Sequence, residues 1–413
     1  MKLSIITPSH RADYLYDLYK SIESQTYQNW EWVLYLNGGL TSKDIPTEIL
    51  KNPKVKVFEN TESNSKVGYL KNQAFKLGTG EVLVEVDHDD LITPDCLDEI
   101  YQAFNKDSDI GFVYSDNAKL DDNFIPYGSQ YGWTYENFDW NGKQLISMNT
   151  PIASAGSMSL IYYAPDHVRA WRTSVYLEIG GHDVNLSILD DQDLMIRTYM
   201  VSKFEYIPKT LYIYRIHGDN TWIERNAQIQ EGTYAMFREW QQKLAERDAD
   251  LNGLRKVDIG GGLFGREGYE TVDITNGDIV ADLNDTWPFK DGEIGVLNAS
   301  HVIEHLVDKQ HTMSEIHRVL ADGGWAFIEV PSTDGRGAFQ DPTHVSYWNQ
   351  NSFLYYTRKD QAQFIYNDTI KFQDRLLETG YFEPWMKTMD VPCTRVWLRA
   401  IKSDTRFPGE VKI

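Results

Sequence analysis

The most constraining feature of the sequence is an apolar stretch that runs directly into a cluster of carboxylates, EVLVEVDHDD at residues 81–90. Residues 81–86 are largely apolar and β-branched and follow a glycine, which predicts a buried central strand. Ending such a strand in Asp87, Asp89 and Asp90 is costly unless something neutralises the carboxylates. A divalent cation does so, because hard cations take oxygen ligands and keep positions open for phosphates. We therefore expect a metal–diphosphate site at this strand end; the alternative is an acidic surface turn.

Strands and helices alternate through the first part of the chain. Apolar runs predict strands at residues 3–7, 30–36 and 55–58, and helical spacing predicts helices at 14–25 and 67–77. This alternation is typical of a parallel sheet with crossover helices. The pattern predicts an α/β nucleotide-binding domain.

A second acidic cluster, Asp190-Asp191-Gln192-Asp193, opens another predicted helix. Capping and the helix dipole explain one acidic residue at such a position, but three in four residues exceed that explanation. A carboxylate held at a rigid helix start beside a sugar site would serve as a general base. Residues 211–217 predict a strand that ends at His217, where a lone histidine is more often structural than a ligand.

Together these segments carry a resemblance through SIITPSHR, DHDD, RTSVYLEIGGHD, DDQDLMIR and YRIHGDNT. The N-terminal part of the chain resembles a glycosyltransferase of the GT-A fold, similar to the inverting enzymes of family 2. The resemblance implies transfer of a sugar from a nucleotide-sugar donor to a glycan acceptor with Mn²⁺ or Mg²⁺, and lipid-linked and protein-linked acceptors both stay open. It further implies that Asp87 and Asp89 bind the metal–diphosphate and the ribose, that His217 completes the metal site with Asp89, and that Asp191 is the base.

At the nucleoside end of the donor, the resemblance implies contacts from Pro8, Ser9 and Arg11. The family usually has an aspartate pair before Gly-Ser at the end of the second strand, where the base is read. Asn37-Gly38-Gly39 stands there in this chain, so the nucleotide base is left open. The chain also lacks the Q-x-x-R-W element and the membrane helices of processive synthases, which implies an enzyme that adds single sugars.

A second domain is predicted after a helical connector at residues 222–250, which gives domains 1–250 and 251–413. LRKVDIGGG predicts a strand that opens into a glycine turn, where the backbone can approach a ligand closely. Further strands are predicted at 269–274, 279–283, 295–300 and 325–331, with a helix at 313–320. An acidic residue at the end of the second strand can hold both hydroxyls of a ribose.

This series resembles the class I S-adenosylmethionine-dependent methyltransferases, which have a Rossmann-like fold, through VDIGGG, YETVDI, IVADLNDTWPF, VLNASHVIEHL, EIHRVLADGGWAFIEVPS and DPTHVSYW. The resemblance implies that S-adenosylmethionine is the cofactor, with Asp273 on its ribose. The other residues implied to line the cofactor are Asp258, Gly260 and Gly262 at the methionine end and Asp282 and Leu283 at the adenine. Only residues 263–269 separate the glycine turn from the second strand, too few for a crossover helix, so we expect a compact variant.

His301, Glu304 and His305 have the spacing of one helix face. A metal pair there lacks a convincing third ligand, which favours a structural or substrate-side role. His344, in DPTHVSYW, is a better candidate for touching the methyl acceptor. Residues 386–403 predict closing antiparallel strands.

Composition excludes several classes of protein. A net charge of −21 argues against binding to nucleic acid or anionic membranes. No apolar run approaches membrane-spanning length, and MKLSIITPS predicts a strand rather than a secretory signal. Cys96 and Cys393, far apart in the sequence, are expected to be reduced core thiols in a cytoplasmic protein.

The combined prediction is a bifunctional enzyme in which a sugar transferase is fused to a methyltransferase that acts on the same glycan. Fusion raises the effective concentration of one product at the next site. Two alternatives stay open: a glycosyltransferase with a non-catalytic methyltransferase-like scaffold, and a glycan- or nucleotide-binding protein without activity. Acidic residues at positions 87, 89 and 191 argue against the second alternative.

Overall fold

The computed structural model describes residues 1–121, 123–126, 132–218 and 224–403, and the chain divides into two compact units. The first unit is Met1–Gln241 and the second begins at Gln242. The long helix α9 (Asn226–Leu251) crosses this division and matches the predicted connector, of which residues 222 and 223 lie outside the described residues. The domain boundary near residue 250 stays a prediction.

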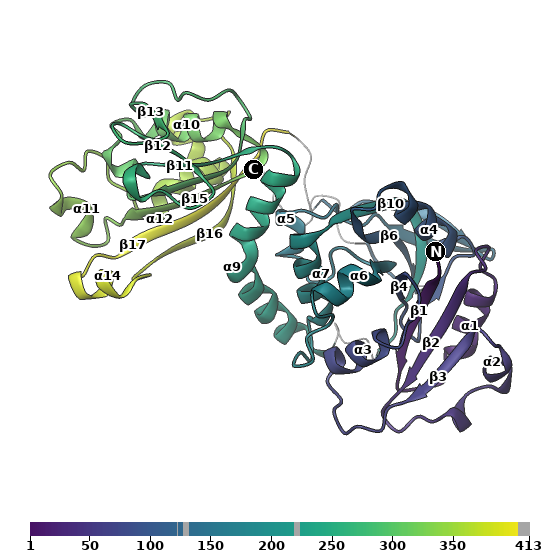
Figure 1. The fold of residues 1–413 in the computed structure, drawn as a ribbon. Coiled ribbons are helices and arrows are strands. Elements are labelled where there is room, and N and C mark those ends of the chain that lie inside the picture. Colours follow the sequence, from purple (N-terminus) through teal and green to yellow (C-terminus); the bar gives the residue numbers. More distant parts are fainter. Residues whose placement is uncertain (122, 127–131, 219–223, 404–413) are drawn as a thin grey trace. The chain divides into compact units, whose positions relative to one another are not determined.

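The first unit is built on a mixed sheet with the order β3-β2-β1-β4-β9-β6-β10-β5 (Figure 1). Its parallel part consists of β1 (Leu3–Ser9), β2 (Trp30–Leu36), β3 (Val55–Glu59) and β4 (Val82–Glu85). The rest consists of β9 (Arg169–Arg172), β6 (Ile110–Leu120), β10 (Lys203–Arg215) and β5 (Leu91–Ile92), with the hairpin of β7 (Tyr135–Trp140) and β8 (Lys143–Met148) beside β6.

The predicted parallel sheet is therefore correct for β1 to β4, and the rest of the sheet is mixed. Strand β9 lies between β4 and β6 and is antiparallel to both, so the chain direction changes in the middle of the sheet. Strands β6 and β10 are parallel to each other, and β5 is antiparallel to β10. The register pairs Ser9 with Leu36 and Ile6 with Glu85, which brings the carboxyl ends of three strands to one edge.

Helices cover both faces of this sheet (Figure 1). Apolar residues of α1 (Leu15–Glu23), α2 (Thr47–Lys51) and α4 (Cys96–Lys106) share one buried core with the strands. Helix α3 (Val67–Phe75) packs on β1 and β2 and also contacts α7 (Asp190–Val201), as do α5 (Ala155–Met158) and α6 (Thr173–Glu178). Helix α7 thus holds its acidic first turn on the α3 side of the sheet.

The second unit has a seven-stranded sheet with the order β13-β12-β11-β14-β15-β17-β16. The parallel strands are β11 (Arg255–Ile259), β12 (Glu270–Asp273), β13 (Ile279–Val280), β14 (Ile294–Ser300) and β15 (Leu320–Pro331). Strand β17 (Cys393–Ala400) is antiparallel to both β15 and β16 (Phe372–Gly380). Helices α10 (Lys309–Val319) and α12 (Gln350–Thr357) pack into the core of this sheet.

Two local predictions can be compared with the second unit. The short connection after the glycine turn is present: a single 3₁₀ turn, η3 (Gly262–Phe264), leads from β11 to β12, with Leu263 78% and Phe264 96% exposed. The prediction of strands over 386–403 is wrong at its start, because helix α14 (Pro384–Met389) occupies that segment with a proline in its first turn. The closing pair is formed by β16 and β17 instead.

Cys96 and Cys393 are both buried and free, as expected of core thiols. Within the described residues, no helix is long and apolar enough to cross a membrane.

Candidate functional site

A cavity of about 1060 Å³ opens at the carboxyl ends of β1, β2 and β4 in the first unit. Most residues predicted to bind the donor or to act on the acceptor line it: Pro8, Arg11, Asn37, Asp87, Asp89, Asp191 and His217. Ser9 has a different position, because its side chain is fully buried and its hydroxyl donates to the Arg11 carbonyl oxygen at 2.6 Å. Its visible role is to shape the turn that carries Arg11.

The three aspartates after β4 have distinct surroundings. Asp90 is buried and accepts hydrogen bonds from the Tyr212 hydroxyl at 2.8 Å and the Arg215 amide at 2.7 Å. Burial, reinforced by Asp89 and Asp87, raises the pKa of Asp90 well above its ordinary value. Asp90 is therefore a buried residue hydrogen-bonded to β10, whereas the Asp87 side chain is 34% exposed.

Asp89 lies against the histidine that the sequence singled out. Its Oδ2 is 2.7 Å from Nε2 of His217, although the two residues are far apart in the chain. The His217 ring stacks on Tyr14, with 5.8 Å between ring centroids. A carboxylate oxygen and an imidazole nitrogen are ligands that Mn²⁺ sites use, and Asp87 lines the same cavity. The residues present thus fit a divalent cation.

Asp191 lies in the first turn of α7 and is held by a buried arginine. Its Oδ2 accepts a hydrogen bond from Nη1 of Arg169 at 2.7 Å. Burial opposes ionisation, but Arg169 and then Lys71 hold the pKa of Asp191 below its ordinary value. Asp191 is therefore an ionised, oriented carboxylate at the cavity wall, a suitable proton acceptor.

The other two acidic residues of that turn have structural surroundings. Asp190 is 5% exposed, and its Oδ2 is 3.4 Å from Nζ of Lys71. Burial raises the pKa of Asp190 to about 6 in spite of Lys71, whose closer partner is Glu85. Asp193 accepts from Nε of Arg197 at 2.9 Å, one helical turn later.

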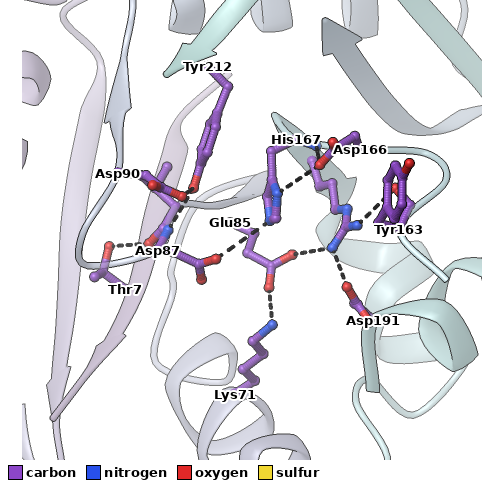
Figure 2. A network of polar contacts seen from close by, with 12 residues as sticks. Thr7, Lys71, Glu85, Asp87, Asp90, Tyr163, Asp166, His167, Asp191 and Tyr212 are labelled. Carbon is purple, nitrogen blue, oxygen red and sulfur yellow. Dashed lines mark hydrogen bonds and ion pairs between the residues drawn. The ribbon is translucent and has the colours of Figure 1, made fainter. Parts of the chain in front are cut away.

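A buried ion network connects these groups and was missed in the sequence (Figure 2). Glu85, at the end of β4, is fully buried; Nζ of Lys71 is 2.6 Å and Nη1 of Arg169 is 3.9 Å from its carboxylate. On the cavity side, Nε2 of His167 is 3.8 Å from Oδ2 of Asp87. Glu85 could have been noticed as a lone charge inside VLVEV, since a buried charge requires a partner.

In the second unit, the glycine turn lies beside the end of the second strand. Gly260 and Gly262 have positive φ, 71° and 48°, and a Cβ on Gly262 would lie 3.2 Å from Oδ2 of Asp273. The Oδ1 atom of Asp273 accepts from the Thr275 amide at 2.9 Å. The Oδ2 atom of Asp273 therefore faces the glycine turn. A carboxylate oxygen in this position fits a hydrogen bond to a ribose hydroxyl.

The remaining implied cofactor residues have other surroundings. Asp258 accepts from Nδ2 of Asn298 at 2.6 Å and from the Arg266 amide at 2.9 Å, so its carboxylate braces the turn. Asp282 is exposed and caps the amide of Asn284. Leu283 is 6% exposed and packs in the hydrophobic core.

The helix face predicted for His301, Glu304 and His305 does not exist. Only a 3₁₀ turn, η4 (Ile303–His305), follows β14, and His301 lies before it with φ 53°. Nε2 of His301 is 3.4 Å from Oε1 of Glu329 on β15. Helical spacing failed because the chain turns sharply at His301.

Comparison with known proteins agrees with both units. Residues 4–162 match the family Glycosyl transferase family 2, and residues 265–328 match the family Methyltransferase domain. The chain is 23% identical over 229 residues to the hyaluronan synthase of Pasteurella multocida, which covers 54% of this chain and 21% of that protein. It is 22% identical over 263 residues to the chondroitin synthase of Escherichia coli, covering 62% and 35%. The matched part of the chain thus spans only 21% and 35% of the length of these two relatives.

Among solved structures, S. aureus TarS (residues 1–349) is similar with a TM-score of 0.44 and 18% identity, covering 60% of this chain and 72% of that one. The two family matches and the two sheets together indicate which class of domain each unit is. Residues 4–162 thus match a family 2 glycosyltransferase domain on the mixed sheet of the first unit, and residues 265–328 match a methyltransferase domain on the mainly parallel sheet of the second unit.

Proposed function

We propose that this chain transfers a single sugar from a nucleotide-sugar donor to a glycan acceptor, with inversion at the anomeric carbon, and that its second domain methylates the same glycan. The observation that supports this most strongly is the shared cavity of the first unit. Asp87, Asp89 and Asp191 all line it, although they come from two segments of the chain. The relatives that synthesise hyaluronan and chondroitin are consistent with a sugar donor.

In the proposed reaction, the acceptor hydroxyl approaches Asp191. The carboxylate takes the hydroxyl proton as the oxygen attacks the anomeric carbon from the face opposite the diphosphate. The bond from that carbon to the diphosphate oxygen breaks, and the configuration inverts. Arg169, 2.7 Å from Asp191, keeps the base ionised and oriented before each attack.

Asp87, Asp89 and His217 are the residues that would hold a divalent cation at the other end of the donor. A bound Mn²⁺ or Mg²⁺ would offset the negative charge that develops on the departing diphosphate. Pro8, Arg11 and Asn37, at the ends of β1 and β2, would contact the nucleoside. In the second domain, Gly260, Gly262 and Asp273 would hold S-adenosylmethionine, which supplies the methyl group.

A panel of nucleotide sugars with and without Mn²⁺ tests the first domain. We expect one donor to raise the melting temperature of the full chain only when Mn²⁺ is present, because ligands that bind the folded state stabilise it. The variant Asp89→Ala should lose this response and sugar transfer, while Asp98→Ala, at a half-buried position in the first turn of α4, should keep both. Undiminished transfer in excess chelator would remove the metal from the proposal.

A further inference from the structure

Three groups of His, Cys, Asp and Glu side chains among the described residues have ligand atoms within 4.8 Å of one another. In two of them a basic side chain already accompanies the carboxylate: Lys71 is 2.6 Å from Glu85, and Arg395 is 2.7 Å from Glu329. The third group consists of Glu304, His305 and His344 in the second unit. Within the described part of the chain, no lysine or arginine pairs with its carboxylate.

Glu304 is the unusual member of this group. The residue is 2% exposed, and neither carboxylate oxygen accepts a hydrogen bond from any described residue. Its Oε1 lies 3.9 Å from Nε2 of His344 and 3.8 Å from Nδ1 of His301. A buried carboxylate without a hydrogen bond is costly, so the native site requires something that compensates it.

The two histidines are oriented by backbone carbonyls. Nδ1 of His344 is 3.1 Å from the Ala338 carbonyl oxygen, and Nδ1 of His305 is 3.1 Å from the Thr343 carbonyl oxygen. Because a carbonyl only accepts, each Nδ1 carries the proton, and each neutral ring presents Nε2 as a lone pair. A histidine fixed in this way by a backbone carbonyl is the usual arrangement of a metal ligand.

Two imidazole lone pairs and a carboxylate are all acceptors, so a cation between them would stabilise the group. Two histidines and one glutamate are the ligand set of many zinc sites that keep an open position. A second carboxylate lies near this group, since Oδ2 of Asp341 is 3.9 Å from Nε2 of His344.

We propose that Glu304, His305 and His344 bind a divalent transition metal of the Zn²⁺ class. The mixed nitrogen and oxygen ligands suit Zn²⁺ better than Mg²⁺ or Ca²⁺. The site adjoins the candidate cofactor turn, since a Cβ on Gly260 would lie 2.6 Å from Val302, two residues before Glu304. An open metal position there would take a hydroxyl oxygen of the methyl acceptor, a role that rests on the proposed methyltransferase function, whereas metal binding itself does not.

Zn²⁺ titration of the chelator-stripped full chain against a chromophoric competitor tests the site. We expect Zn²⁺ to bind and to raise the melting temperature of the second unit. His305→Gln and His344→Gln should each weaken Zn²⁺ binding by about 100-fold or more, because losing only a residue that orients a ligand already costs about 10–100-fold. His311→Gln, a matched change on α10, should leave this binding unchanged.

Glu304→Gln keeps the test decisive if a histidine variant fails to fold. With a metal site, this variant loses the Zn²⁺-induced rise in melting temperature. The proposal is wrong if Zn²⁺ does not change the melting temperature of the wild type and Glu304→Gln melts at a higher temperature than the wild type. That result would show that a proton shared between Glu304 and a histidine, rather than a metal, compensates the buried carboxylate. Loss of Zn²⁺ binding in His301→Asn or Cys393→Ser, but not in His344→Gln, would move the metal to the neighbouring group and also overturn it.

Discussion

At the scale of single residues, the three acidic side chains that open α7 have three different environments. Only Asp191 combines a place on the cavity wall with a pKa held below its ordinary value by Arg169. Asp190 is buried beside Lys71, and Asp193 pairs with Arg197. Sequence spacing predicted an acidic helix start but could not separate these roles, because the basic partners come from other segments.

Asp191→Asn tests the assignment of the base. The change keeps the size of the side chain but removes its proton affinity, so the turnover rate should fall by about 100-fold or more with little change in donor affinity. The measurement is steady-state kinetics with the active donor. Asp193→Asn, in the same turn, should retain activity; a crippled Asp190→Asn beside an active Asp191→Asn would show that the base was assigned to the wrong neighbour.

Asp190 should make the stability of the first unit depend on pH. Its folded pKa of about 6 lies above the ordinary value, so the stabilisation from its protonated form is full below pH 4 and is lost as pH rises through 6. The shift of about two pH units corresponds to about 3 kcal/mol. Asp190→Asn stays neutral and should therefore gain stability relative to the wild type as pH rises.

Urea unfolding at pH 4.5 and pH 8 measures this difference. We expect the gain from Asp190→Asn to be small at pH 4.5 and to approach 3 kcal/mol, roughly, at pH 8. Asp193→Asn is the control, because its ion pair with Arg197 is partly exposed and should change stability little at either pH. An equal difference at both pH values would contradict the assignment of a raised pKa to Asp190.

At the scale of elements, the hydrophobic pattern predicts the strands that carry the site but not the directions in which they run. Residues 81–86 read as a central strand, and β4 occupies Val82–Glu85 between β1 and β9. Strand β9 was not foreseen, because RAWR is short and two of its four residues are arginines. Those arginines are explained only by partners in space, such as Asp191 for Arg169.

An ion pair between Glu85 and Lys71 connects β4 with α3. We therefore expect a large loss of stability when Lys71 is replaced by an uncharged residue. Lys71→Met removes the nearer of the two cationic side chains beside the fully buried Glu85 and leaves Arg169, at 3.9 Å. Breaking a buried pair by removing one partner costs about 3–5 kcal/mol. Urea unfolding should show this loss in the transition of the first unit.

The control variants for this pair separate charge from packing. Lys76→Met, at the exposed end of α3, should change stability by less than about 0.5 kcal/mol. The double variant Lys71→Met/Glu85→Leu should be more stable than Lys71→Met alone, because an apolar pair leaves no buried charge unmatched. A single variant as stable as the wild type would show that Glu85 is not ionised.

At the scale of the whole molecule, each unit has its own sheet and its own buried core. We therefore expect the two proposed activities to be lost separately. Asp89→Ala should abolish sugar transfer and leave S-adenosylmethionine binding unchanged, while Asp273→Ala should do the reverse. The ribose hydrogen bonds at stake are worth about 1.5–3 kcal/mol each, so Asp273→Ala should weaken binding at least about tenfold.

Calorimetry on the full-length variants distinguishes the outcomes. No heat from the wild type at millimolar cofactor would favour the alternative in which the second domain is a non-catalytic scaffold. Loss of both functions in either variant would contradict separate sites.

The turn η3 that replaces a crossover helix also decides where the native chain can be cut. Phe264, at its end, is 96% exposed and lies on a short connection, and exposed turns are the preferred sites of proteolytic nicking. Chymotrypsin, which cuts after aromatic residues, should therefore cleave there, and also after Tyr366, which is 95% exposed. A cofactor seated on Gly260 and Gly262 would shield the first site and not the second. In a timed digest, S-adenosylmethionine should slow the appearance of the fragment that ends at Phe264 and leave the cut at Tyr366 unchanged.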